Sequence, residues 1–279
     1  MCLRPSTDEP IRIYRYSSGG WEFQETGVIE EASVSLTVNG EMWLSFTCTP
    51  THLEELCVGF LFNEGIIQDI GEVEIVLVNA NQTNVDIWLD RAVEKPTQWR
   101  RTSGCTGGIS MVEPDAEIKK LPAGNIKEKI VADGMRLLLK AQALYRKTKG
   151  VHCSALYDGE CIYYVAEDIG RHNTLDKLAG MYLLSKKSLQ SVMVLTTGRV
   201  SSEMLQKSAK LGAIAVISRT SPTTLSIQMA KKLGVTLIGY ARRDQFMVYA
   251  HPERLAEYPA SKTGEDLSQP DKPSSNNSA

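Results

Sequence analysis

The chain has 279 residues, of which 42% are hydrophobic and 23% charged, as in an ordinary soluble protein with a sizeable core. Lys and Arg number 31 against 33 Asp and Glu, and the net charge of -2 argues against a general nucleic-acid binder. No apolar run is long enough to span a bilayer, and residues 1–10 lack the apolar centre of a signal peptide. We therefore expect no membrane partner and a cytoplasmic location.

Residues 1–95 predict a small mixed β/α domain. Asn39 and Gly40 form a strong hairpin signal between two alternating runs. Residues 51–54 match a capping box that would open a helix, and Gly65 would end that helix. Strands are expected at residues 11–16, 34–38, 42–46, 73–78 and 85–89.

Residues 96–124 have the composition of a connector, with several prolines and glycines. Cys105 lies inside this connector, and the small residues on both sides would leave its sulfur accessible, which a nucleophilic thiolate requires. Its position alone would favour an incidental free thiol. Cys48, Cys57, Cys153 and Cys161 lie among apolar residues and are expected to be buried core thiols. The six cysteines lack zinc-motif spacing, so we expect no structural metal.

Residues 125–258 predict an α/β/α domain. A long amphipathic helix is expected over 125–147, followed by a hairpin over 152–167 that turns at Asp158 and Gly159. Helices then alternate with short apolar strands, which indicates a parallel sheet covered on both faces. The expected helices lie at 175–185, 202–211 and 223–233, the last capped by Ser221 before Pro222, and the expected strands at 192–195, 214–217 and 236–239. Residues 259–279 form a polar tail that we expect to be disordered.

Four loops in this second domain each follow a strand-like run and each carry arginine, at residues 167–173, 196–203, 218–223 and 239–245. The carboxyl ends of parallel strands share one edge of the sheet, and ligands bind in the crevice at that edge. Guanidinium groups gathered there would suit a phosphate-bearing ligand, because they form bidentate hydrogen bonds to oxyanions. In these loops His172 could act as a general acid or base, or contact a ligand, or simply serve as a structural residue at the start of the next helix. Arg199 precedes a helix start where an anion can bind, although ordinary capping would also explain the pattern.

Taken together, residues 168–177, 197–203, 218–223 and 248–252 resemble the FdhD family, sulfur carriers required for formate dehydrogenase activity. The resemblance covers nearly the whole chain apart from its two ends. It implies a cytidine-deaminase-like α/β/α fold for the larger domain and is consistent with a homodimer. It also implies sulfurtransferase activity, in which Cys105 receives sulfane sulfur from a cysteine desulfurase as a persulfide. The sulfur would pass to the molybdenum or tungsten bis(molybdopterin guanine dinucleotide) cofactor before that cofactor enters formate dehydrogenase.

The same resemblance matches a segment near the C-terminus to the family's cofactor-binding segment, namely Tyr240, Ala241, Arg242, Arg243, Asp244 and Gln245. Arg199, Arg219 and His172 are the further candidates for contact with the cofactor. Many members carry a second cysteine three residues after the first, where this chain has Gly108. A second thiol could release the sulfur by exchange and leave a disulfide, so its absence favours direct delivery from Cys105.

Two alternative functions make different demands on the sequence. A zinc deaminase needs a His-x-Glu or Cys-x-Glu element and a later Pro-Cys-x-x-Cys, and the nearest candidate, His152 followed by Cys153 and Ser154, lacks the glutamate. A non-enzymatic chaperone that binds the molybdenum cofactor for formate dehydrogenase would not need Cys105 but would need Arg242 and Arg243. These two requirements separate the chaperone from the sulfur carrier.

Overall fold

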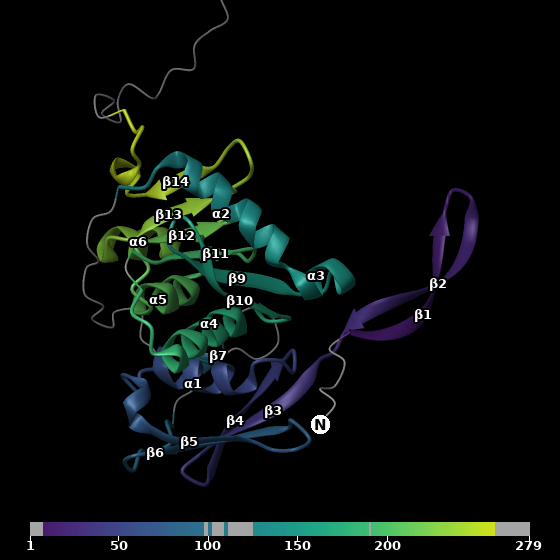
Figure 1. Cartoon of the computed structure of the whole chain (residues 1–279), viewed down its shortest axis with the longest axis vertical. Helices are drawn as coiled ribbons and strands as arrows, with labels where there is room; N and C mark the ends of the chain where they lie inside the picture. Colours follow the sequence, from purple (N-terminus) through teal and green to yellow (C-terminus); the bar gives the residue numbers. More distant parts are fainter. Residues whose placement is uncertain (1–7, 98–99, 102–108, 111–124, 190, 260–279) are drawn as a thin grey trace, which may run out of the picture.

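The structure is a computed structural model that describes residues 8–97, 100–101, 109–110, 125–189 and 191–259. These residues form two main sheets, a projecting two-stranded arm, a short strand pair and six α-helices (Figure 1). The mixed α/β class predicted from the sequence is confirmed.

The smaller sheet has the strand order β4-β3-β6-β5. Its hairpin turns at Asn39 and Gly40, whose φ angles of 49° and 82° are those of the predicted tight turn. Inward side chains such as Leu36 and Ile87 pack against Leu56 of helix α1 in one core. The elements of this part are β3 (Ala32–Val38), β4 (Glu41–Cys48), α1 (Leu53–Asn63), the short 3-10 helix η1 (Ile70–Glu72), β5 (Val73–Val78) and β6 (Asn84–Leu89).

The larger sheet has the order β10-β9-β11-β12-β13-β14. The predicted parallel pairing is confirmed for β11, β12 and β13, whereas the remaining pairs are antiparallel, so the sheet is mixed. Strand β14 was not predicted; a tight turn after β13 returns the chain antiparallel to it. The strands are β9 (His152–Tyr157), β10 (Ile162–Asp168), β11 (Met193–Thr196), β12 (Ala215–Ser218), β13 (Thr236–Gly239) and β14 (Met247–Ala250), and a 3-10 helix η2 (Pro252–Arg254) follows.

Helices cover both faces of the larger sheet, as predicted (Figure 1). Leu195 and Ile217 face helix α2, whereas Val194 and Val216, their neighbours along the strands, face the opposite group of helices. The two cores therefore lie on either side of one buried sheet. The helices are α2 (Glu128–Ala141) on one face and α4 (Arg171–Ser185), α5 (Ser202–Lys210) and α6 (Thr224–Leu233) on the other.

The predicted single helix over 125–147 is wrong, because the chain breaks at Gln142. Helix α2 ends at Ala141, and a separate short helix α3 (Ala143–Thr148) begins after Gln142, whose ψ is 95°. The buried Glu167 carboxylate accepts the backbone N–H groups of the first three residues of α3 at 2.8, 2.8 and 2.9 Å. It thereby satisfies donors that have no partner inside a helix.

Three predicted helix starts also differ. His52, not a capping box, precedes α1, in the left-handed region with φ 53° and without a side-chain cap. Thr223, not Ser221, caps α6 by accepting the Ser226 N–H at 3.2 Å. Helix α4 begins at Arg171, before its predicted start at 175, because Asp168 accepts the Gly170 N–H at 2.7 Å and orders the turn that leads into it.

The smaller and larger sheets are joined where helices α1 and α4 cross. A Cβ on Gly59 would lie 1.8 Å from the Asp176 carbonyl oxygen, and one on Gly180 would lie 1.9 Å from that of Glu55, so only glycine permits this approach. Asp168, at the end of β10, accepts the Thr49 N–H at 3.1 Å and Lys177 Nζ at 2.6 Å. The loop after β10 is thereby fixed to the segment between β4 and α1.

Strands β1 (Asp8–Ser17) and β2 (Gly20–Ile29) form an antiparallel arm that projects away from both sheets (Figure 1). The strand predicted at 11–16 is confirmed, and its partner was not predicted. The arm contacts the rest of the chain at its base, where Ile29 lies against Gly150, just after α3.

Candidate functional site

The carboxyl ends of β10 to β13 meet at one edge of the larger sheet, as the arginine-bearing loops predicted. Strand β9 runs antiparallel to β11, so its first residues lie at the same edge. The loops are hydrogen-bonded to one another: Arg219 N–H donates to the Thr196 carbonyl at 3.0 Å, and Tyr240 N–H donates to the Thr220 carbonyl at 3.1 Å. This edge is where a ligand of such a fold is expected.

Described residues line two cavities at this edge, and the larger of these has a volume of about 510 Å³. Three basic side chains contribute to its wall, Lys149, His152 and Arg219, and none of the described residues that line it carries a carboxylate. The remaining wall is part apolar and part polar, formed by Leu139, Gln142, Tyr145, Gly150, Val151, Ile169 and Thr197. Its size is that of a small-molecule site, and its charge favours an anion.

His152 is the most unusual of the three basic groups. Burial lowers its pKa from the ordinary value, and the neighbouring positive charge of Arg171 lowers it further, although the Asp168 carboxylate opposes this shift. His152 is therefore neutral near pH 7 and can donate or accept a hydrogen bond there. A bound anion would favour its protonated form.

The smaller cavity has a volume of about 210 Å³ and is lined by Tyr240, Arg242, Gln245, Phe246 and Met247. Tyr240 has φ 50°, a left-handed conformation that is costly for a bulky residue and that clusters at functional sites. Three backbone hydrogen bonds hold this turn, including Ala241 N–H to the Ser218 carbonyl at 2.9 Å and Arg242 N–H to the Gln245 carbonyl at 2.8 Å. The segment that resembles the family's cofactor-binding segment is thus locked against the loop after β12.

Only some of the residues predicted to contact the ligand line a cavity. Arg199, Arg243 and Asp244 are exposed and line neither cavity, and Ala241 is buried beneath the turn. Arg219 lines the larger cavity, and Tyr240, Arg242 and Gln245 line the smaller one. The structure therefore brings four of the nine predicted ligand contacts to cavity walls.

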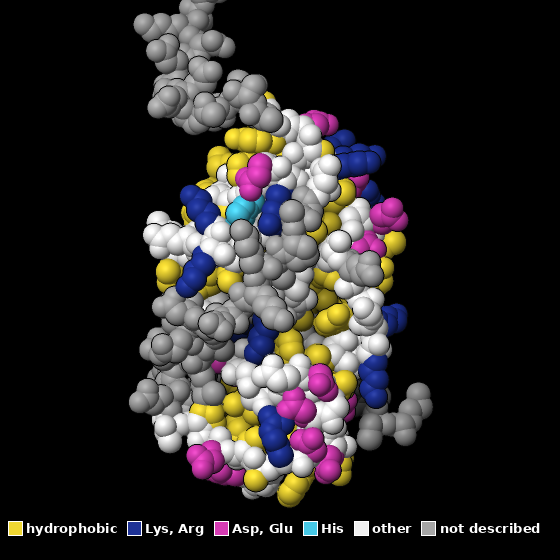
Figure 2. Space-filling model, turned by 90° about the vertical axis from the view of Figure 1, so that its left-hand side faces the viewer, with side chains coloured by type: hydrophobic (Ala, Val, Ile, Leu, Met, Phe, Trp, Pro, Cys, Tyr) yellow, Lys and Arg dark blue, Asp and Glu magenta, His cyan; other side chains and the backbone are white. Residues whose placement is uncertain are grey.

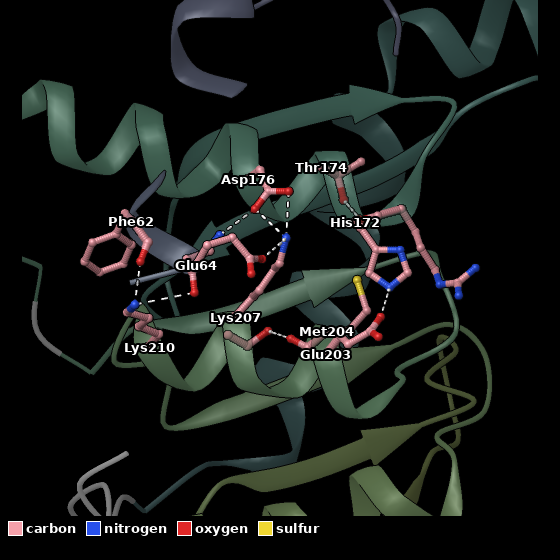
Figure 3. A network of polar contacts seen from close by, with 12 residues as sticks. Phe62, Glu64, His172, Thr174, Asp176, Glu203, Met204, Lys207 and Lys210 are labelled. Carbon is pink, nitrogen blue, oxygen red and sulfur yellow. Dashed lines mark hydrogen bonds and ion pairs between the residues drawn. The ribbon is translucent and has the colours of Figure 1, made fainter. Parts of the chain in front are cut away.

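His172 is buried in the first turn of α4, the position that the structural alternative for this residue predicted. Its Nε2 lies 3.1 Å from Glu203 Oε2 and 3.4 Å from Ser201 Oγ (Figure 3). Burial lowers the pKa of His172, and the Glu203 carboxylate opposes the shift. This imidazole links α4 to the start of α5 and lines neither cavity.

A buried ionic network lies farther along the same helices (Figure 3). Lys207 Nζ lies 2.7 Å from Asp176 Oδ1 and 3.7 Å from Glu64 Oε1. Burial opposes the charge of Lys207, but Asp176 and Glu64 raise its pKa above the usual value. The network joins α1, α4 and α5, so the helices behind the sheet edge are tied together by paired charges.

The positive charge at the edge is a local arrangement. Figure 2 shows one face on which Asp and Glu side chains gather mainly at the lower end, over the smaller sheet, while Lys and Arg side chains are dispersed. The described Lys and Arg side chains on that face form no continuous surface, in keeping with the net charge of -2.

Cys105 lies outside the described residues. The chain on either side of it pairs as two short strands, β7 (Arg100–Arg101) and β8 (Ile109–Ser110). Cys48, Cys57 and Cys153 are buried as predicted, and burial raises the pKa of each, to about 12 for Cys48. The prediction for Cys161 is wrong: it is exposed, beside the turn before β10. The three buried thiols are therefore poor nucleophiles, and Cys161 is the matched control for Cys105.

Stability should fall as the medium becomes mildly acidic. The pKa values of His152 and His172 are both lowered by burial, so below about pH 6.5 the unfolded chain binds more protons than the folded one. The free energy of unfolding should therefore decrease from about pH 6.5 down to the lowered native pKa values. Urea unfolding across about pH 7.5 to 5 should give a smaller decrease for His172→Gln than for the wild type, because the variant lacks one buried imidazole. Identical pH slopes in the variant and the wild type would contradict this assignment.

Among the described residues no group of three or more His, Cys, Asp or Glu is arranged to hold a metal ion. His152 lines the larger cavity, while Cys153 points into the core beside α2. No helix among these residues combines the length and the apolar character that crossing a membrane requires.

Sequence reasoning missed several residues that line the larger cavity, chiefly Lys149, His152, Gln142 and Tyr145. They come from the start of β9 and from α3 with the residues that flank it, not from an arginine-bearing loop. The hairpin predicted over residues 152–167 could have indicated these residues. In an antiparallel hairpin the first strand begins at the edge where the second strand ends, so the start of β9 lies beside the end of β10.

Comparison with known proteins gives consistent results. The model of a family described as the FdhD/NarQ family matches residues 29–256. A Bacillus subtilis protein named sulfur carrier protein FdhD is 34% identical over 252 residues, covering 88% of this chain and 96% of its own. A Staphylococcus aureus protein of the same name is 32% identical and covers 88% of this chain and 95% of its own.

A solved structure from Desulfotalea psychrophila, described as that of a formate dehydrogenase accessory protein, superimposes with a TM-score of 0.78. It is 29% identical and covers 90% of this chain and 100% of its own. The similarity therefore extends across both sheets and the sheet edge that carries the cavities.

Proposed function

Because the chain belongs to the FdhD/NarQ family, we propose that it is a sulfurtransferase that carries sulfur as a persulfide on Cys105. The observation that carries this proposal is the similarity, over nearly the full length of both chains, to relatives named sulfur carrier protein FdhD. The acceptor in this proposal is the bis(molybdopterin guanine dinucleotide) cofactor, bound as a substrate, and the end user is formate dehydrogenase.

In the loading step the Cys105 thiolate attacks the terminal sulfur of a persulfide on a cysteine desulfurase. A new S–S bond forms at Cys105 while the S–S bond on the desulfurase breaks, and the desulfurase cysteine leaves as a thiolate. The step involves no net oxidation or reduction. It requires an accessible thiolate, which suits a cysteine flanked by small residues and does not suit the buried Cys48, Cys57 and Cys153.

Gly108 stands where the family resemblance leads us to expect a second cysteine, so a thiol at this position cannot expel the sulfur by forming a disulfide. Conversion of the carried sulfur to sulfide takes up an electron pair, which an external thiol or the acceptor metal would have to supply. Cys105 then returns to its thiolate form. Direct delivery from Cys105 is the route that this sequence allows.

The edge of the larger sheet is the proposed binding site for the dinucleotide groups of the cofactor. Arg219, Lys149 and His152 would face phosphate in the larger cavity, and Arg242 with Tyr240 and Gln245 would bind in the smaller one. Arg199, Arg243 and Asp244, which are exposed at the same edge, could contact parts of so large a ligand outside the cavities. Holding acceptor and donor sulfur together is the main rate contribution expected. This transfer is proposed to take place in the cytoplasm.

Sulfur transfer can be tested with labelled cysteine. Incubation with a cysteine desulfurase and cysteine labelled with radioactive sulfur should load label onto the chain. A thiol reductant should release the label, and the bis(molybdopterin guanine dinucleotide) cofactor should receive it before insertion into apo formate dehydrogenase. A chain that activates the dehydrogenase without ever taking up label would favour the cofactor chaperone instead.

A further inference from the structure

The smaller sheet carries exposed apolar side chains on the face turned away from α1. Ile87 of β6 is buried in the core beneath α1, and Trp88 follows it and points the other way, because side chains alternate along a strand. Ile75 of β5 lies opposite Trp88 and shares its face. The exposed apolar members of this outer face are 44% to 56% exposed, and they are Met42, Ile75, Leu77 and Trp88. Such neighbouring apolar side chains at a surface indicate an interaction site.

The domain that carries the outer face is strongly acidic. Residues 30–97 contain 12 Asp and Glu but only two Lys and Arg, a net charge of -10, whereas the whole chain has -2. Asp86 lies opposite Leu77 on the outer face itself, and Glu74 and Asp90 are exposed where β5 begins and β6 ends. Figure 2 shows the acidic side chains gathered over the smaller sheet. This charge would repel a phosphate-bearing ligand and attract a positively charged protein.

We propose that the outer face docks a positively charged surface of the protein that donates sulfur to Cys105, an inference that rests on the proposed function. The anionic cofactor has its proposed site at the basic edge of the larger sheet, where the dehydrogenase would collect it. The sulfur donor is then the partner left for an acidic, apolar surface. Cys105 follows Thr97, the end of the acidic domain, by only eight positions, so a donor bound to this domain is close along the chain to the thiol that it must load.

The composition of the outer face suits a partner that must leave after each transfer. A small apolar centre with charged surroundings is typical of transient interfaces, which bury less area than permanent ones. Complementary charge raises the rate of encounter more than it raises the affinity. Association of donor and carrier should therefore weaken as the salt concentration rises.

Binding of the full chain to a purified cysteine desulfurase, measured by sedimentation at low and high salt, tests the charge. Glu74→Lys with Asp90→Lys should weaken binding about tenfold at low salt, and the difference should shrink at high salt. Glu160→Lys with Glu257→Lys makes the same change in net charge at exposed positions of the larger domain and should bind nearly as the wild type does. Equal affinities for the two double variants would overturn the proposal.

The apolar centre is tested in the same way. Trp88→Ser should weaken binding to the desulfurase about tenfold, because aromatic side chains contribute most to interface energies. Tyr163→Ser removes an exposed ring from β10 in the larger sheet and should leave binding unchanged. Matching melting temperatures for Trp88→Ser and the wild type would show that the variant is folded. Unchanged binding by folded Trp88→Ser would refute the docking site.

Loading measurements separate docking from sulfur chemistry. Glutathione persulfide needs no docking surface: the Cys105 thiolate takes its outer sulfur and glutathione leaves as a thiolate. It should load Trp88→Ser and the wild type at equal rates, whereas limiting desulfurase should load the variant about tenfold more slowly. A wild type that accepts sulfur from neither donor would refute the proposed function, and the binding measurements would still decide the docking site. Normal desulfurase binding with impaired dehydrogenase activation would assign the outer face to the dehydrogenase and overturn the proposal.

Discussion

Replacement of Cys105 by alanine is expected to abolish formate dehydrogenase activation in cells that depend on this chain. The proposed carrier forms its S–S bond at this sulfur, and alanine offers no group that can replace it. The loss should be complete rather than partial, since Cys48, Cys57 and Cys153 are buried with raised pKa values. Formate-dependent dye reduction in cells lacking their own carrier measures the outcome.

Two control variants allow this experiment to distinguish a sulfur carrier from a cofactor chaperone. Cys161→Ala removes the exposed thiol among the described residues and should retain full activation. Arg242→Ala alters the wall of the smaller cavity and should reduce activation through weaker cofactor binding while leaving sulfur loading intact. A chaperone that only binds the cofactor predicts the reverse for Cys105, namely that the alanine variant works. Activation by Cys105→Ala at the wild-type level would therefore eliminate the carrier mechanism.

Asp168→Asn should lower the free energy of unfolding by about 3–5 kcal/mol, because it leaves the Lys177 charge buried without its counterion. Both side chains are fully buried, and Asp168 also accepts the Thr49 and Gly170 N–H groups and the Asn173 side-chain amide. The melting temperature should fall by roughly 10 °C for a chain of this size. Thermal and urea unfolding both measure the change.

Asp133→Asn is the matched control, since Asp133 forms an exposed ion pair with Arg136 on α2. Exposed pairs contribute about 0–1 kcal/mol, so this variant should be nearly neutral. The double variant Asp168→Leu with Lys177→Met removes both buried charges and should regain part of the loss. A loss no greater for Asp168→Asn than for Asp133→Asn would show that the junction of the two sheets does not depend on this pair.

The regular elements of the fold were largely predictable because local patterns determine them. The hairpin at Asn39 and Gly40 follows from the conformations these residues favour, and β11 to β13 follow from short apolar runs between amphipathic helices. The break at Gln142 was not predictable, since its cause is the Glu167 carboxylate on β10, a distant position in the sequence. Local sequence cannot reveal which distant carboxylate will supply a cap.

The candidate site was predictable in its location but only partly in its membership. Arginine in successive strand-end loops pointed to this edge, and Arg219 and Arg242 line cavities there. His172 does not line either cavity, because α4 begins at Arg171 and places His172 in its first turn, with the imidazole toward Glu203. Lys149 and His152 reach the larger cavity through the antiparallel pairing of β9, which brings a strand start to an edge otherwise formed by strand ends.

The central claim is that one sulfur atom is carried on Cys105, and intact-protein mass spectrometry tests it most directly. The purified chain would be incubated with a cysteine desulfurase and cysteine, weighed without reductant, and then mapped by peptide. The account predicts a mass increase of one sulfur atom, removed by a thiol reductant and located on the peptide that contains Cys105. No added sulfur under conditions in which the desulfurase turns over, or added sulfur located only on Cys161, would contradict the account.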